Sequence, residues 1–158
     1  VVIYNKKLDT WGPGAHAGTF RGNQLAMVAG TVVMERLKSP GFLEAVIRKG
    51  DKFRSRMEAL KAECPIIGDV RGKGLMLGIE FVDPNGPVDI MGHPMESGTI
   101  CARVQKECFE NHLVMEKGGR NGSTMRCLTA LNISDEDLET GIRILEKVVR
   151  NINKEYVK

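Results

Sequence analysis

The segment Ile66–Asp83, IIGDVRGKGLMLGIEFVD, constrains the fold of this chain more than any other part of it. Two apolar runs flank the tetrapeptide Arg71-Gly72-Lys73-Gly74, a pattern that predicts two antiparallel strands joined by a glycine-containing turn. A two-stranded hairpin is marginally stable at best in water. Other parts of the chain must therefore supply helices or strands that cover its apolar side.

Helices are predicted in four segments, because apolar side chains recur there every three or four residues. The first runs from Asn23 to the Ser39-Pro40-Gly41 stop, and the second continues from there to Cys64-Pro65. The third spans about residues 100–111. The last follows Ser134-Asp-Glu-Asp137, which resembles a capping box.

Further strands are predicted at Val1–Tyr4, Leu113–Glu116 and 124–132 (TMRCLTALN), with an irregular loop from Pro84 to Gly98. This order predicts an α+β fold, a small and mainly antiparallel sheet with helices on one face. The first strand and first helix do not obviously belong to that sheet. We therefore predict that residues 1–38 end a preceding domain and that residues 39–158 form the α+β domain.

The composition argues against several classes of partner. The 158 residues carry a net charge of +3, with basic and acidic side chains interspersed, so neither nucleic acid nor a membrane surface is expected as a partner. No apolar run is long enough to cross a bilayer and no signal-peptide pattern is present, so a cytoplasmic protein is expected. The four widely spaced cysteines are predicted to be reduced and mostly buried. The three histidines lack ligand-like spacing, so no metal site is expected.

The first candidate for chemistry is the stretch GAHAGTFRGNQLAMVAG, Gly14–Gly30. Gly18 permits close approach to the backbone, Thr19 offers a hydroxyl and an N–H, and a helix follows with the positive end of its dipole. These features suit a phosphate group. An ordinary loop that enters a helix fits the same residues.

Arg126 is the second candidate, because it lies inside the apolar strand TMRCL, where an unpaired charge is costly. A guanidinium binds a carboxylate through two parallel hydrogen bonds. The alternatives are an ion pair with a neighbouring acid or a position that faces water. Arg71, Lys73 and the loop EKGGRNGS, Glu116–Ser123, are weaker candidates, for which solvated turns are an adequate interpretation.

Together, HAGTFRGNQLAMVAG, VRGKGLMLGIEF, EKGGRNGSTMRCLTALNIS and the capped last helix resemble the class III aminotransferases, pyridoxal-phosphate enzymes of fold type I. The order and spacing of the segments agree over essentially the whole chain. GTFRGNQLA and EKGGR are most similar to the members that use 2,4-diaminobutyrate and 2-oxoglutarate. Relatives that act on ornithine, 4-aminobutyrate or acetylornithine commonly carry Pro where Gln24 stands.

The resemblance implies roles for particular residues. The Thr of the Gly-Thr motif, here Thr19 with Gly18 and Phe20 beside it, contacts the phosphate of pyridoxal phosphate across a homodimer interface. Arg126 matches the arginine that binds the substrate carboxylate. The resemblance also implies the carboxy-terminal small domain of such an enzyme, preceded by a strand and a helix of its large domain, with amino acids and 2-oxo acids as substrates.

The chain departs from the family at the residues that carry the reaction. The lysine that binds the cofactor lies two to three dozen residues before the Gly-Thr motif in the family, but only 18 residues precede Thr19, and Lys6 and Lys7 are too close to it. We therefore expect a carboxy-terminal part of a longer transaminase that is inactive alone and contains no catalytic residue. The alternatives are a transaminase that uses ornithine, 4-aminobutyrate or another omega-amino donor, and a non-catalytic α+β interaction module.

Overall fold

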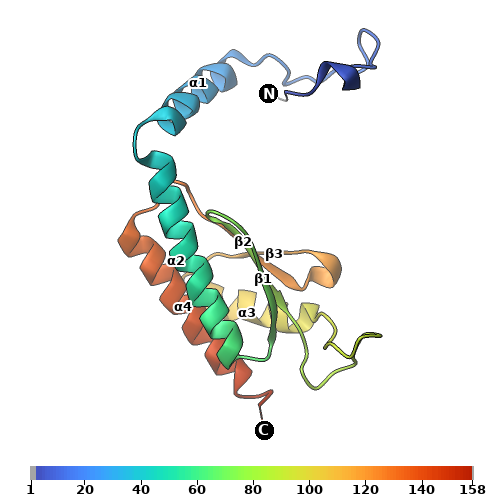
Figure 1. Cartoon of the computed structure of the whole chain (residues 1–158), viewed down its shortest axis with the longest axis vertical. Coiled ribbons are helices and arrows are strands. Elements are labelled where there is room, and N and C mark those ends of the chain that lie inside the picture. Colours follow the sequence, from blue (N-terminus) through green and yellow to red (C-terminus); the bar gives the residue numbers. More distant parts are fainter. Residues whose placement is uncertain (1–2, 158) are drawn as a thin grey trace. The chain divides into compact units, whose positions relative to one another are not determined.

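The computed structural model describes residues 3–157 of the chain (Figure 1). The predicted hairpin is confirmed: β1 (Ile67–Lys73) pairs antiparallel with β2 (Met76–Phe81). Its turn, however, is Gly74-Leu75 and not Arg71–Gly74, because Lys73 already pairs with Met76. Gly74 takes a positive φ of 55° and Leu75 is only 2% exposed, so the turn is anchored in the core. Arg71 and Lys73 therefore belong to a strand.

Two more strands complete an antiparallel sheet with the order β1-β2-β4-β3. β4 (Thr124–Leu128) pairs with β2 on one side and with β3 (Glu116–Gly118) on the other. The predicted strand 113–116 is therefore wrong except at its last residue, and β4 ends four residues earlier than predicted. Leu113 and Met115 precede β3 and pack against the core from a loop, which explains why their apolar pattern resembles a strand.

Three helices supply the apolar partner for one face of the sheet: α2 (Phe42–Glu63), α3 (Gly98–Glu110) and α4 (Asp135–Asn153). Figure 1 shows α2 and α4 running along the same side of the sheet. Alternate strand residues point into the core between these layers, among them Val70, Leu77, Ile79, Met125 and Cys127. The predicted α+β fold is thus confirmed.

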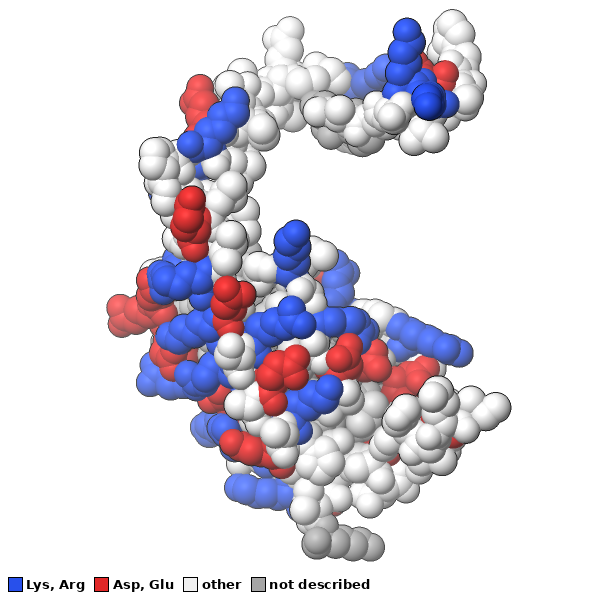
Figure 2. Space-filling model, viewed as in Figure 1, with Lys and Arg blue, Asp and Glu red and all other residues white. Residues whose placement is uncertain are grey.

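The helices are fixed by caps and by ion pairs. The Ser134 hydroxyl accepts a hydrogen bond of 2.9 Å from the Asp137 amide, which confirms the predicted N-cap of α4. Arg56 of α2 holds Glu146 of α4 through two hydrogen bonds of 2.7 Å each. Over residues 43–157, Figure 2 shows basic and acidic side chains interspersed on the visible face, as the sequence pattern predicted.

Glycine permits a close contact between α2 and the hairpin. A Cβ atom added to Gly50 would lie 2.4 Å from the carbonyl oxygen of Gly74. The neighbouring Lys49 is buried, and its ammonium group donates to the carbonyl oxygen of Ile133 before α4. These contacts position α2 against both the hairpin turn and the loop that follows β4.

All four cysteines are buried and free, as predicted. Burial raises the pKa of the Cys101 thiol to about 11 and those of Cys108 and Cys127 to about 12. Because the thiolate is the reactive form, these side chains behave as inert core residues at neutral pH.

The chain divides into two compact units, residues 1–42 and residues 43–158, each of which makes most of its contacts within itself. The first contains a short 3-10 helix, η1 (Lys6–Leu8), and α1 (Gln24–Lys38), which carries exposed apolar residues around its circumference, including Leu25, Val28, Val32 and Met34. Of the predicted strand Val1–Tyr4, the first two residues lie outside the described residues, and Ile3 and Tyr4 are not in a strand. Among the helices of residues 3–157, none is long and apolar enough to cross a membrane.

Candidate functional site

The face of the sheet opposite the helices carries the polar strand residues. Because strand residues alternate between faces, the antiparallel register aligns them in rows across the four strands. One row consists of Arg71, Gly78, Arg126 and Glu116. The adjacent row consists of Asp69, Glu80, Thr124 and Gly118. We call these eight residues the polar face.

Arg126 stands in the middle of the polar face and is half-exposed. Its Nη1 donates a hydrogen bond of 3.1 Å to Oε1 of Glu116, the residue opposite it on β3. The ion pair that the sequence left as an alternative is therefore present. Both side chains are about half exposed, at 47% and 57%, and a pair this exposed contributes little to stability. The remaining nitrogens of this guanidinium have no protein partner among residues 3–157.

Arg71 is held much more tightly than Arg126. Its guanidinium donates to Asp69 at 2.9 Å and to Glu80 at 2.7 Å, and a third contact of 3.3 Å reaches the hydroxyl of Thr124. The hydrogen bond from Arg71 is the largest cause that holds the pKa of the Asp69 carboxyl below its ordinary value. Arg71 is therefore part of a fixed network and not a solvated turn residue.

Three glycines leave space around Arg126 and Thr124. A Cβ atom on Gly78 would lie 3.1 Å from Cγ2 of Thr124, and one on Gly118 would lie 3.2 Å from Cδ of Arg126. At Gly119, where φ is 74°, a Cβ atom would lie 2.4 Å from the Thr124 hydroxyl. Side chains at these positions would displace the two polar groups.

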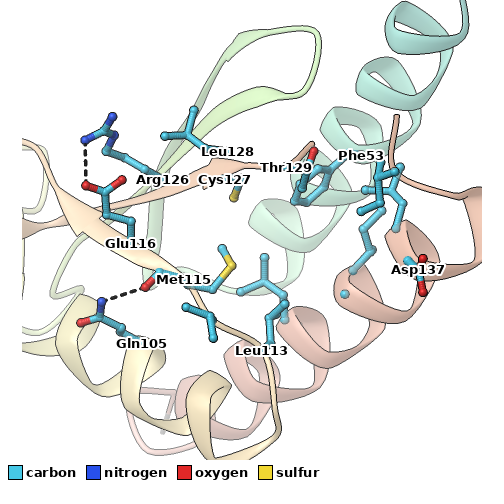
Figure 3. Close-up of a pocket in the computed structure, with 16 residues that line it drawn as sticks. Phe53, Gln105, Leu113, Met115, Glu116, Arg126, Cys127, Leu128, Thr129 and Asp137 are labelled. Carbon is cyan, nitrogen blue, oxygen red and sulfur yellow. Dashed lines mark hydrogen bonds and ion pairs between the residues drawn. The ribbon is translucent and has the colours of Figure 1, made fainter. Parts of the chain in front are cut away.

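An apolar cavity of about 470 Å³ lies beside β4, between the sheet and α4. Figure 3 shows Arg126 and Glu116 facing each other at one end of it, with Phe53 and Thr129 toward the other. The amide of Gln105 donates to the Met115 carbonyl at 2.9 Å and fixes the loop before β3. Arg126 thus belongs to the polar face and also lines this cavity.

Thr19 lies in a turn of the first unit, where the Arg21 amide donates to the Gly18 carbonyl at 3.0 Å. α1 begins only at Gln24, and the Asn23 side chain at its N-terminus accepts a hydrogen bond of 2.9 Å from the Ala26 amide. Because a helix dipole acts within about one turn, it contributes less at Thr19 than the sequence suggested. Gly18 has open space around its Cβ position and Phe20 is exposed.

The structure therefore brings Arg126 together with residues that the sequence analysis did not single out. Glu116 was noted only as the end of a predicted strand and the start of a loop, and Thr124 and Gly78 were not considered as site residues. The available signal was the alternation in TMRCL, which places Thr124 on the same face as Arg126. Thr19 and Arg126 lie in different units, and their roles stay predictions.

The family model described as aminotransferase class-III matches residues 1–149, and the chain belongs to this family. Class III aminotransferases are in general pyridoxal-phosphate enzymes that act on amino acids and 2-oxo acids.

Among curated proteins, the chain is 48% identical over 139 residues to a diaminobutyrate--2-oxoglutarate aminotransferase of Rhizobium meliloti, covering 88% of this chain and 30% of that protein. It is 37% identical over 149 residues to the enzyme of the same name from Haemophilus influenzae, covering 94% and 33%. The ornithine aminotransferase of Toxoplasma gondii, crystallised with partial occupancy of PLP, has a similar fold, with a TM-score of 0.71, 24% identity and coverage of 93% and 32%. The chain thus spans about a third of these relatives.

Proposed function

We propose that this chain is the carboxy-terminal part of a transaminase that moves an amino group from a diamino acid, 2,4-diaminobutyrate, to 2-oxoglutarate. The observation that carries the proposal is Arg126, a half-exposed guanidinium on the polar face whose single hydrogen-bond partner in the described part of the chain is the exposed Glu116. The names of the two curated relatives support the donor and the acceptor.

In this proposal Arg126 binds a substrate carboxylate. The guanidinium offers a fork of N–H groups that matches two carboxylate oxygens, and only Nη1 is in use. A bound carboxylate therefore replaces or shares the contact with Glu116 at little cost, since an exposed ion pair is weak.

Thr19 would bind the phosphate of pyridoxal phosphate. In a homodimer, this contact would be made in the site of the other subunit. The residues present fit that group. Neither the hydroxyl nor the amide of Thr19 has a hydrogen-bond partner among residues 3–157, and the preceding Gly18 leaves open space beside them. When bound, the cofactor supplies the electron-accepting ring on which amino-group transfer depends. The lysine that anchors it would come from the part of the enzyme that precedes this chain.

The domain boundary follows the same proposal, with residues 1–38 as the end of the large cofactor-binding domain and residues 39–158 as the small domain. The first unit, with its exposed apolar helix α1, supports this division. A helix that is apolar on all sides is normally buried in a larger assembly.

The test uses the longer enzyme together with this chain. The 158-residue chain with pyridoxal phosphate, diaminobutyrate and 2-oxoglutarate should form no glutamate. In the longer enzyme, Arg126→Met should raise KM for 2-oxoglutarate roughly tenfold or more, because the carboxylate loses hydrogen bonds to a charged group. The matched Arg143→Met, on the exposed side of α4, should leave KM unchanged.

A second arm addresses the cofactor. Thr19→Ala should weaken cofactor retention roughly tenfold, followed by absorbance after dialysis, whereas Thr10→Ala in the same exposed loop should not. Turnover by the chain alone, or an Arg126→Met enzyme with normal KM, would contradict the proposal. Preference for ornithine or 4-aminobutyrate over diaminobutyrate would change the donor and leave the roles of Thr19 and Arg126 in place.

A further inference from the structure

We propose that the Thr124 hydroxyl is a second hydrogen-bond donor to the carboxylate held by Arg126, and that Arg71 is the residue that positions this hydroxyl. The inference rests on the proposed carboxylate role of Arg126 and adds a binding residue to it.

The two groups share one small part of the polar face. Thr124 and Arg126 are two residues apart on β4 and so project from the same side of the sheet. Arg126 approaches Gly118, where a Cβ atom would lie 3.2 Å from its Cδ and 4.0 Å from its Nη1. Thr124 is directly opposite Gly118, and its hydroxyl occupies the place that a Cβ atom of Gly119 would need. The guanidinium and the hydroxyl thus both border the Gly118-Gly119 pair.

The contact with Arg71 determines which way the Thr124 hydroxyl donates. Arg71 has only donors, so the Thr124 oxygen accepts the 3.3 Å hydrogen bond from Nη2. The hydroxyl proton must then point to another acceptor, and residues 3–157 supply none. Since Thr124 is only 6% exposed, its proton needs a partner. A carboxylate bound at Arg126 supplies one.

Arg71 is suited to positioning and poorly suited to binding the ligand itself. Asp69 and Glu80 hold its guanidinium and balance its charge. Its stem passes Gly78, where Cγ lies 3.9 Å from the position that a Cβ atom would take. Arg71 therefore reaches from β1 across β2 to the hydroxyl on β4, while the charge of the ligand is met by Arg126.

The experiment measures steady-state kinetics of the longer enzyme with 2-oxoglutarate as the varied substrate. Thr124→Val keeps the shape and removes the hydroxyl, and we expect KM to rise about tenfold with kcat unchanged. Thr124→Ser keeps the hydroxyl and should restore KM to within about twofold of the unaltered enzyme. The matched control is Thr140→Val, at an exposed threonine of α4. The absorbance of the bound cofactor should be the same in all three.

Arg126→Met, measured in parallel, separates this inference from the function on which it rests. A raised KM in Arg126→Met with a normal KM in Thr124→Val overturns the inference alone. A normal KM in Arg126→Met overturns the carboxylate role and the inference together. If Thr124→Ser behaves like Thr124→Val, the residue contributes packing and the inference is wrong.

A second variant covers a folding failure of Thr124→Val, which thermal unfolding of the 158-residue chain would reveal. Arg71→Met removes the positioning contact at a half-exposed residue. We expect it to raise KM for 2-oxoglutarate by several-fold, less than Thr124→Val, with kcat unchanged. An unchanged KM in a folded Arg71→Met enzyme overturns the positioning role.

Discussion

At the scale of single residues, two arginines of this chain form ion pairs with opposite consequences. Arg126 pairs with Glu116, and both side chains are about half exposed. Arg56 instead pairs with Glu146, which is only 9% exposed, and also contacts Glu139. Removal of Arg56 leaves the largely buried carboxylate of Glu146 with one basic partner among residues 3–157, Arg150 at 3.6 Å. Removal of Arg126 leaves a half-exposed carboxylate, that of Glu116, in contact with water.

We therefore predict a difference in the free energy of unfolding of the 158-residue chain. Arg126→Met should change it by less than about 0.5 kcal/mol, because exposed pairs contribute little. Arg56→Met should lower it by about 1–3 kcal/mol, because a buried acid loses its main partner. Urea titration followed by circular dichroism measures both. A large loss with Arg126→Met would mean that this arginine serves the fold.

The sequence found Arg126 because a charge inside an apolar strand is conspicuous. It did not find Thr124, since threonine is common in strands and nothing in its immediate surroundings marks it. The role of Thr124 depends on Arg71, which is 53 residues away in the chain and reaches it only through the sheet register. Such a relation cannot be read from local pattern.

At the scale of elements, two helical glycines differ in how much space surrounds them. A Cβ atom on Gly50 of α2 would collide with the backbone of Gly74 at 2.4 Å. A Cβ atom on Gly141 of α4 would meet only Cδ1 of Leu113 at 3.6 Å, an ordinary contact. Both positions have helical backbone, so alanine would favour the helix in each case by up to about 1 kcal/mol.

We predict that Gly50→Ala destabilises the chain by about 1–3 kcal/mol, because α2 must move away from the hairpin turn. Gly141→Ala should stabilise it by up to about 1 kcal/mol. Thermal unfolding of the two variants beside the unaltered chain measures both effects. Equal effects would show that α2 does not depend on close approach to the hairpin.

The elements themselves were largely predictable, and their ends were less so. The four helices and the hairpin could be predicted from the spacing of their apolar residues and from the turn and capping residues between them. The hairpin turn was placed too early because Arg71-Gly72-Lys73-Gly74 looks like a polar turn. The structure instead places the turn at Gly74-Leu75, because burial of Leu75 fixes the register. β3 was misplaced for a similar reason. Leu113 and Met115 gave the segment a strand-like apolar pattern, but they pack against the core from a loop and do not pair in the sheet.

At the scale of the whole molecule, its acidic groups make stability depend on pH. Hydrogen bonds from basic side chains hold the pKa values of several carboxyls below their ordinary range, namely those of Asp69, Asp135, Glu139 and Glu155. A carboxyl whose pKa is lower in the folded than in the unfolded state stabilises the fold above its unfolded value, about 3.9 for Asp and 4.3 for Glu. That stabilisation disappears as pH falls through the folded value.

We predict a nearly constant urea midpoint from pH 7 down to about pH 5, and a fall that begins near pH 4 and continues below it. Asp69→Asn should reduce the steepness of that fall, because one of the shifted groups is removed. Urea titrations at intervals between pH 7 and pH 2.5 measure the curve. A midpoint that stays constant to pH 3 would contradict the assigned ion pairs.

The resemblance to class III aminotransferases was visible in the sequence and is confirmed by the family match over residues 1–149. The proposed contact of Thr19 with the cofactor phosphate could not be derived from residue spacing, because in that proposal it is made in a second subunit.

The exposed apolar circumference of α1 has a practical consequence for anyone who expresses this chain. Leu25, Val28 and Val32 are more than half exposed on a helix with few charges. The recombinant product therefore carries an exposed apolar surface that favours aggregation. Mild detergent, or removal of residues 1–42, should therefore be the first measure against precipitation during purification. The four-stranded sheet and the helices that share its buried apolar core would remain for crystallisation or spectroscopy.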